Sequence, residues 1–243
     1  MKIICAGVGK TGTKSIAKAL RHLGFTVFDW EEQTFDFQDH WVDVFQNGAK
    51  LDVKRVYQHA DAIVDSPGSF FWEEILEAYP DSKVILSERE EDSWLKSLVN
   101  QLQVIEEVKS RRFLCVLSPT SRKGFFVLYS IINAFLGTAN PKSACIFRTR
   151  YRQHNHRVKS LVPPEKLLVY NVKQGWKPLC DFLGCEVPTV AFPHENIKGE
   201  IAEVLLSETR YGRQVIWEIQ RAVIVILSVI VVIVGSIFVF LSY

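Results

Sequence analysis

Nine residues near the start of the chain, Gly7 to Ser15 (G-V-G-K-T-G-T-K-S), combine three glycines, two lysines and three hydroxyl side chains. They follow the apolar run 3–6 and precede a segment, 16–23, with helical apolar spacing. A strand that enters a glycine-rich turn and then a helix directs backbone N–H groups and the helix dipole at an anion. We therefore expect this segment to bind a phosphate; the alternative is a turn that needs glycines only for its own conformation.

The spacing leaves the ligand open. A Walker A loop requires lysine directly after its second conserved glycine, but Thr13 follows Gly12 and Lys14 comes one place late. The three glycines also fit G-x-G-x-x-G, the fingerprint of dinucleotide-binding domains, and Asp29 ends the next apolar run where a ribose-binding acid is expected. An NAD-binding Rossmann oxidoreductase or epimerase is therefore one alternative.

A second segment carries phosphate-binding chemistry. Residues 83–89 are predicted to form a strand that ends at Arg89, and Ser97 follows eight residues later in the next predicted helix. The guanidinium fork and a hydroxyl on that helix could converge on one phosphate. The alternative is a surface pair between Arg89 and Glu90 or Glu91, with Ser97 merely exposed.

These two segments together resemble the donor site of the sulfotransferases, which use 3′-phosphoadenosine-5′-phosphosulfate (PAPS). In that family a lysine precedes the loop glycine, as Lys10 does here, and an arginine and a serine with the spacing of Arg89 and Ser97 hold the 3′-phosphate. The chain is identified as a member of the P-loop sulfotransferase-like family over roughly residues 1 to 196. Some members of this family are labelled as nucleotide-sugar epimerases because they carry the G-x-G-x-x-G pattern. Further matching segments are 62–67, 70–72, 79–83, 154–155, 162–163, 167–170, 175–184, 187–188 and 192–193.

The resemblance implies an α/β fold, a P-loop NTPase-like three-layer sandwich with a parallel sheet. It implies sulfuryl transfer from PAPS, as co-substrate, to an unidentified hydroxyl or amine, with no metal. Lys10 would stabilise the departing oxygen. Asp65 stands where the family has its general-base histidine; a helix cap or a buried pair with lysine is the alternative role. The donor-binding residues implied are Gly9, Lys10, Thr11, Gly12, Thr13, Lys14, Ser15, Arg89 and Ser97.

The chain departs from well-studied cytosolic sulfotransferases in two further ways. Ser15 occupies the place of an aromatic residue that stacks on adenine. Their C-terminal R-K-G loop is missing from its expected place, and Arg122-Lys123-Gly124 spells it only in mid-chain. A catalytically inactive nucleotide-binding membrane protein is therefore the second alternative.

Composition narrows the function classes. The chain has 243 residues and a net charge of +2, so it lacks the basic field expected of a nucleic-acid-binding protein. Five cysteines without a C-x-x-C pair indicate reduced thiols. His154 and His156 lie two apart in an arginine-rich segment, which favours a solvated helix face over a metal site. The N-terminal apolar run is too short for a signal peptide.

Strands and helices are predicted to alternate, which favours a parallel sheet covered on both faces. Ligand sites in such sheets lie beyond the carboxyl ends of the strands, where Gly9, Asp29, Asp65 and Arg89 are expected. The apolar runs 113–117 and 125–135 are candidates for acceptor-pocket helices. The predicted strands are 2–6, 26–29, 62–64, 83–87 and 166–171, and the predicted helices include 14–23, 72–78, 93–108, 151–161 and 176–183.

The segment 222–241 contains twenty residues without a charge, long enough as a helix to cross a bilayer about 30 Å thick. Arg210, Arg213 and Arg221 precede it, with Trp217 as an interface anchor, so we expect the domain to face the cytosol. The expected organisation is a sulfotransferase-like domain (1–196), a juxtamembrane linker or helix (197–221) and a transmembrane tail anchor (222–241). The acceptor is then a small molecule or a lipid; the oligomeric state stays open.

Overall fold

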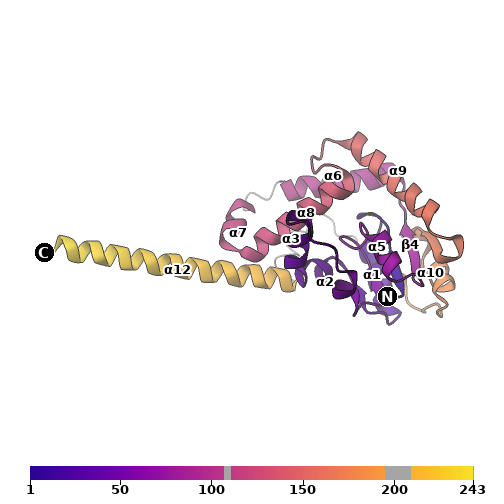
Figure 1. Cartoon of the computed structure of the whole chain (residues 1–243), viewed down its shortest axis with the longest axis horizontal. Coiled ribbons are helices and arrows are strands. Elements are labelled where there is room, and N and C mark those ends of the chain that lie inside the picture. The colour runs from indigo at the N-terminus through magenta and orange to yellow at the C-terminus, as the bar shows by residue number, and fades with distance from the viewer. Residues whose placement is uncertain (107–110, 195–208, 243) are drawn as a thin grey trace.

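The computed structural model describes residues 1–106, 111–194 and 209–242. An α/β domain is followed by one long helix that projects from it (Figure 1). In chain order the strands are β1 (Ile3–Cys5), β2 (Val27–Phe28), β3 (Ala62–Ile63), β4 (Lys83–Ser87) and β5 (Leu167–Tyr170). The α-helices are α1 (Thr13–His22), α2 (Trp30–Phe35), α3 (Gln38–Gln46), α4 (Val53–Tyr57), α5 (Trp72–Ala78), α6 (Glu91–Glu106), α7 (Arg111–Leu117), α8 (Pro119–Leu136), α9 (Ala144–Leu161), α10 (Trp176–Leu183) and α12 (Arg210–Leu241).

The five strands form one sheet in the order β2-β3-β1-β4-β5, and every neighbouring pair is parallel. This confirms the predicted α/β class with a parallel sheet. Each strand lies within its predicted range, and α5 and α10 have the predicted bounds. Helix α9 begins at Ala144 and not at the predicted Tyr151. Arg148 and Arg150 separate the apolar first turn from Tyr151, so the sequence pattern did not extend the predicted helix to Ala144.

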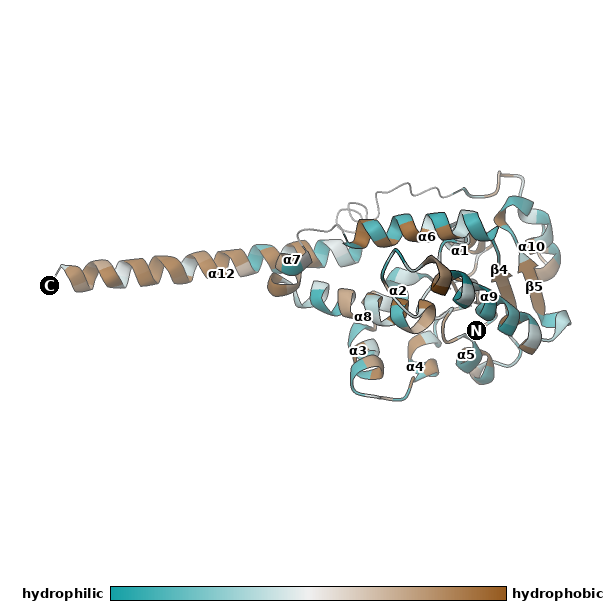
Figure 2. Cartoon of the chain, turned by 90° about the horizontal axis from the view of Figure 1, so that it is seen from above, coloured by the Kyte–Doolittle hydropathy of each residue, from teal (hydrophilic) through white to brown (hydrophobic). Residues whose placement is uncertain are grey.

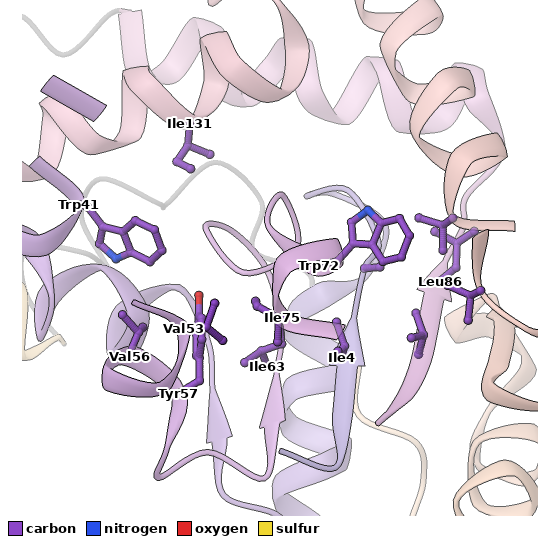
Figure 3. Close-up of a cluster of buried hydrophobic side chains, with 14 of the residues drawn as sticks. Ile4, Trp41, Val53, Val56, Tyr57, Ile63, Trp72, Ile75, Leu86 and Ile131 are labelled. Carbon is purple, nitrogen blue, oxygen red and sulfur yellow. The ribbon is translucent and has the colours of Figure 1, made fainter. Parts of the chain in front are cut away.

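The core lies on both faces of the sheet, because successive strand residues point to opposite sides. Ile3 and Cys5 of β1 pack on one face, with α1 and α10, whereas Ile4 and Ala6 pack on the other. Figure 3 shows the second face, where strand residues, including Ile4, gather with aromatic and aliphatic side chains of the covering helices. The sheet is therefore a rigid support for the residues at its carboxyl edge.

Two segments predicted as acceptor-pocket helices have different environments. Residues 125–135 lie in α8, whose Val127, Ile131 and Phe135 are buried in the core. Residues 113–117 lie in α7, where Phe113 and Val116 are largely exposed. Packing in the core therefore accounts for the apolar side chains of α8 but not for Phe113 and Val116 of α7.

Helix α12 is one continuous helix of 32 residues, and it contains an 18-residue window with a mean hydropathy of 3.3 that is not buried in the domain. Figure 2 shows its projecting part as almost uniformly hydrophobic. By length and composition this helix can cross a membrane. It begins at Arg210, inside the segment predicted as a linker or helix; residues 195–208 lie outside the described part.

Candidate functional site

The glycine-rich turn between β1 and α1, residues 7–15, is called the glycine loop below. Its backbone is left-handed at Lys10 (φ 75°) and at Gly12 (φ 100°). A side chain at Gly7 would place its Cβ 1.9 Å from Oγ of Ser87, at the end of β4. Two of the glycines therefore have a local reason, a close approach at Gly7 and a left-handed turn at Gly12.

Buried hydrogen bonds hold the loop from below. The Thr11 hydroxyl donates to the carbonyl of Val8 at 2.7 Å and lies 2.6 Å from the hydroxyl of Ser87. The indole N–H of Trp94, in α6, donates to the carbonyl of Gly9 at 3.0 Å. Thr11 is 1% exposed, so its hydroxyl positions the loop rather than facing its mouth.

Asp65 forms one wall of the loop, just after β3. Thr13 Oγ1 donates to Asp65 Oδ2 at 2.7 Å, and the backbone N–H of Ser66 donates to Asp65 Oδ1 at 2.8 Å. Asp65 is left-handed (φ 70°), a conformation that costs a residue with a side chain about 1–3 kcal/mol. These hydrogen bonds thus hold the Asp65 carboxylate beside the candidate phosphate-binding residues, although the backbone of Asp65 has an unfavourable left-handed conformation.

Arg89 forms the opposite wall, just after β4. Its Nη1 donates to the carbonyl of Lys10 at 3.4 Å, and its Nε donates to the Ser93 hydroxyl at 2.9 Å. Of the two alternative surface partners, Glu91 pairs with arginines of α9, and Glu90 accepts from two backbone N–H groups at the start of α6. Arg89 therefore faces the loop, not the neighbouring carboxylates.

Ser97 lies four residues after Ser93 and hence on the same face of α6, one turn farther from Arg89. In this structure the guanidinium of Arg89 contacts the hydroxyl of Ser93, a residue that the sequence pattern did not single out. The i, i+4 spacing of the two serines is the signal that could have indicated it.

The two lysines of the loop differ. Burial lowers the pKa of Lys10 below its ordinary value, with Asp65 opposing this and Arg89 and Lys14 reinforcing it. Lys14 donates to Asp29 Oδ2 at 2.7 Å. Burial acts to lower the pKa of Lys14, but Asp29 and Asp65 outweigh it, so this pKa lies above its ordinary value.

Asp29, the candidate ribose-binding acid, has structural partners. Besides its pair with Lys14, it caps α2 in a reciprocal arrangement with Glu32, whose carboxylate accepts from the backbone N–H of Asp29 at 2.9 Å. It is 4% exposed. A buried, paired helix cap is poorly placed to bind a ribose, and this weakens the dinucleotide alternative.

Helix α9 supports the site from behind. The hydroxyl of Tyr151 donates to the Arg89 carbonyl at 2.8 Å and accepts from the Arg89 N–H at 3.0 Å. Its ring stacks on Trp94 with centroids 4.1 Å apart. His154 Nε2 lies 2.6 Å from the carbonyl of Ala6, so the expectation of a solvated face is wrong for this histidine.

The residues of α9 that face inward recur at helical spacing within a charged segment: Tyr151, Asn155 and Val158 are buried. His154 is adjacent to them and half-buried, and burial lowers its pKa. This i, i+4, i+7 pattern was the available signal for the supporting helix, but four nearby arginines obscured it.

A surface pocket of about 390 Å³ adjoins Arg89, between the ends of β4 and β5. Tyr151, Asn171 and Gln174 line it, together with three glutamates. Those carboxylates are compensated. Glu88 pairs with Lys159, Glu91 pairs with arginines, and Glu90 accepts from two backbone N–H groups at the start of α6. The acidic wall therefore presents less negative charge than its composition suggests.

The mid-chain R-K-G tripeptide lies in α8, away from these walls. Lys123 pairs with Asp39, and a Cβ at Gly124 would lie 2.5 Å from the hydroxyl of Tyr211. Ser15, which occupies the place of the adenine-stacking aromatic residue, is likewise packed, because it is buried in α1. The structure thus gives the tripeptide a packing role.

The central strand of a parallel sheet, followed by a glycine loop and a helix, defines an α/β domain of the sulfotransferase P-loop-like type. Residues 2–201 match the family described as "Sulfotransferase domain", and the chain belongs to this family. It is also 31% identical over 208 residues to "Ava biosynthesis cluster protein M" of Aspergillus versicolor, with 80% of each chain covered. The resemblance expected from the sequence is confirmed.

Proposed function

We propose that this protein is a membrane-anchored sulfotransferase that moves a sulfuryl group from PAPS to a hydroxyl or amine acceptor. One observation carries the proposal. Strands β3 and β4 flank β1, so Asp65 and Arg89 lie on opposite sides of the loop that contains Lys10. The cations of Lys10 and Arg89 suit an anionic donor. The carboxylate of Asp65 suits an acceptor that must lose a proton.

Lys10 is assigned to the oxygen that bridges sulfur and the 5′-phosphate. In the transfer the acceptor atom forms a bond to sulfur while the bond from sulfur to that bridging oxygen breaks. The bridging electron pair stays on the departing nucleotide, and the Lys10 ammonium stabilises the developing charge. The loop N–H groups and the N-terminus of α1 supply further positive potential, so this charge needs no metal ion.

Asp65 is assigned to the proton of the acceptor. Its two oxygens each accept one bond within the protein, which orients the carboxylate and leaves lone pairs for a third donor. His154 is less suited to this role, because its Nε2 already contacts the Ala6 carbonyl. General-base action requires hydrogen-bond reach to the acceptor, so this assignment has the acceptor bind beside Asp65 at the edge of the glycine loop.

Arg89 and Ser97 are assigned to the 3′-phosphate of the donor, as the resemblance implies. The remaining loop residues, including Gly9, Thr13 and Lys14, surround the 5′-phosphosulfate. The pocket beside Arg89 has the volume of a small-molecule site and offers room for the nucleoside. The pairing of Asp29 favours this arrangement over NAD.

Calorimetry on the full chain in detergent tests the donor. We expect 3′-phosphoadenosine 5′-phosphate to bind, adenosine 5′-phosphate to bind more weakly, and NAD not to compete. Arg89→Ala should cost roughly 2–3 kcal/mol for the first nucleotide alone, because it removes a charged phosphate contact. Lys54→Ala, an exposed cation on α4, is the control. Binding of NAD alone would overturn the proposal.

Helix α12 is assigned as the anchor, with the domain on the cytosolic side because arginines precede the apolar segment. Anchoring favours an acceptor at the membrane surface, a lipid or an amphipathic alcohol, since it raises the rate of encounter. Protease treatment of sealed microsomes tests the orientation. The domain should be digested without detergent; protection would place it in the lumen.

A further inference from the structure

The first part of α12, residues 210–218, packs on the domain. Tyr211 is 7% exposed and Val215 is fully buried. The Tyr211 ring makes edge contacts with Trp30 and Phe35, with centroids 6.0 Å and 6.1 Å apart. The orientation of α12 relative to the domain is therefore fixed by this packed segment, residues 210–218, which is called the seat of α12 below.

Glu218 fastens this seat to the start of α8. Its carboxylate accepts from the Ser118 hydroxyl, from the Thr120 N–H at 3.1 Å and from the Thr120 hydroxyl at 2.6 Å. A carboxylate at the N-terminus of an 18-residue helix also meets the positive end of its dipole. Ser118 directly follows α7, so the end of α7 lies beside Glu218 along the axis of α12.

The apolar segment begins only four residues later, at Ala222. Four residues of helix advance about 6 Å. The polar zone on each side of a bilayer is roughly 5–8 Å thick. With α12 inserted, the end of α7 falls within that zone.

Helix α7 has the surface for this position. Phe113 is 58% exposed and Val116 is 75% exposed, and Arg112 beside them is exposed too. Both views place α7 at the end of the domain from which α12 projects (Figures 1 and 2). On α12 itself, Trp217 is 51% exposed and the guanidinium of Arg221 lies 5.4 Å from its ring centroid. Aromatic and basic side chains of this kind are typical of membrane interfaces.

We propose that α7 is a second membrane contact, with Phe113 and Val116 inserted among the lipid headgroups and Arg112 beside anionic lipid. It rests on the proposed anchoring by α12 and is continuous with it. The occupant of the α7 surface is the lipid bilayer. Two contacts, one spanning and one interfacial, fix the orientation of the domain relative to the membrane.

Fluorescence quenching in vesicles tests the proposal. Two full-length chains are compared, both with Cys115→Ser and Cys185→Ser. The first also carries Cys145→Ser and Val116→Cys, and its probe is attached at position 116. The second, the matched control, keeps Cys145 and carries its probe there. Cys145 is exposed and follows the far end of α8, which is about 27 Å long. Spin-labelled lipid in phosphatidylcholine–phosphatidylserine vesicles should quench the probe at 116 several-fold more than the probe at 145.

A second variant strengthens the test. Phe113→Asp in the 116-labelled chain should reduce quenching toward the level of the Cys145 control. Flotation of every variant with vesicles reports insertion of α12 separately. A chain that fails to float overturns both the anchor and this proposal. A chain that floats with equal quenching at both sites overturns only the α7 contact. A blue-shifted probe at 116 without lipid quenching would show that protein covers α7, and also overturns it.

Discussion

Lys10 and Asp65 both hold left-handed backbone conformations that side chains disfavour, and both are assigned to the chemistry. Each is held by bonds to neighbouring segments. Arg89 donates to the Lys10 carbonyl, and Thr13 donates to the Asp65 carboxylate. The sequence predicted these roles through its resemblance to the sulfotransferases, and it placed Asp65 at the end of a parallel strand. It did not predict that Thr11 turns inward or that Lys14 pairs with Asp29, since both depend on the path of the turn.

At the residue scale, removal of the Lys10 ammonium should slow transfer by roughly 10²–10³-fold, the typical cost of losing one donor to a developing anion. Asp65→Asn should cost about 10²-fold or more by removing the base. Release of 3′-phosphoadenosine 5′-phosphate from PAPS, with and without a hydroxyl acceptor, measures both. Full activity of Lys10→Ala would contradict the mechanism, whereas full activity of Asp65→Asn would contradict only the base assignment.

The lowered pKa of Lys10 adds a pH dependence. Activity should fall as pH rises through that pKa, which lies below the ordinary lysine value of 10.5 because of burial. Lys10→Arg, if active, should move this alkaline limb to higher pH, since arginine keeps its proton. An unchanged limb in Lys10→Arg assigns the titration to another group.

At the scale of elements, the five strands and helices α1, α5 and α10 were predictable because Gly, Pro and polar residues separate compact apolar runs. The short helices α2, α3 and α4 were not predicted, and helices α8 and α9 were predicted only in part. The apolar residues of α8 did not indicate whether they face the core or an acceptor pocket, and the buried residues of α9 lie among arginines. As a result the supports from Trp94, Tyr151 and His154 were missed, because they are made by helices remote in sequence from the loop.

Tyr151→Phe tests the supporting role of α9. It removes the hydroxyl that bonds both backbone groups of Arg89, which should lower stability by about 1–2 kcal/mol. Because Arg89 then shifts, the preference for 3′-phosphoadenosine 5′-phosphate over adenosine 5′-phosphate should fall roughly tenfold, about 1.4 kcal/mol. Tyr57→Phe is the control, since its buried hydroxyl bonds Gln33 and not Arg89. Equal loss of preference in both variants would refute positioning.

At the scale of the whole molecule, Glu218 joins domain and tail. Burial acts to raise the pKa of this carboxyl, but bonds from Ser118, Thr120 and Gln214 outweigh it, so the pKa lies below its ordinary value. A depressed folded-state pKa stabilises the fold above the unfolded value, near 4.5, and this contribution is lost as pH falls through the folded value.

Glu218→Gln should therefore lower the thermal midpoint at neutral pH, by an amount equivalent to roughly 1–2 kcal/mol. The difference from the parent chain should shrink as the pH falls through the folded-state pKa of Glu218, which lies below 4.5. Thermal unfolding of the full chain in detergent measures this, with the exposed Glu77→Gln as control. A deficit that persists unchanged at low pH would show that the ionised carboxylate is not the stabilising group.

The seat of α12 has a consequence for the choice of acceptor. A disordered tether of 20 residues would let a domain sample distances of about 25 Å from the bilayer. A continuous helix that packs on α2 and α8 and then enters the lipid allows no such range. In the proposed arrangement the glycine loop therefore stays at one height above the membrane. The enzyme then selects acceptors by the distance of their reactive group from the lipid surface, in addition to the fit of their shape to a pocket.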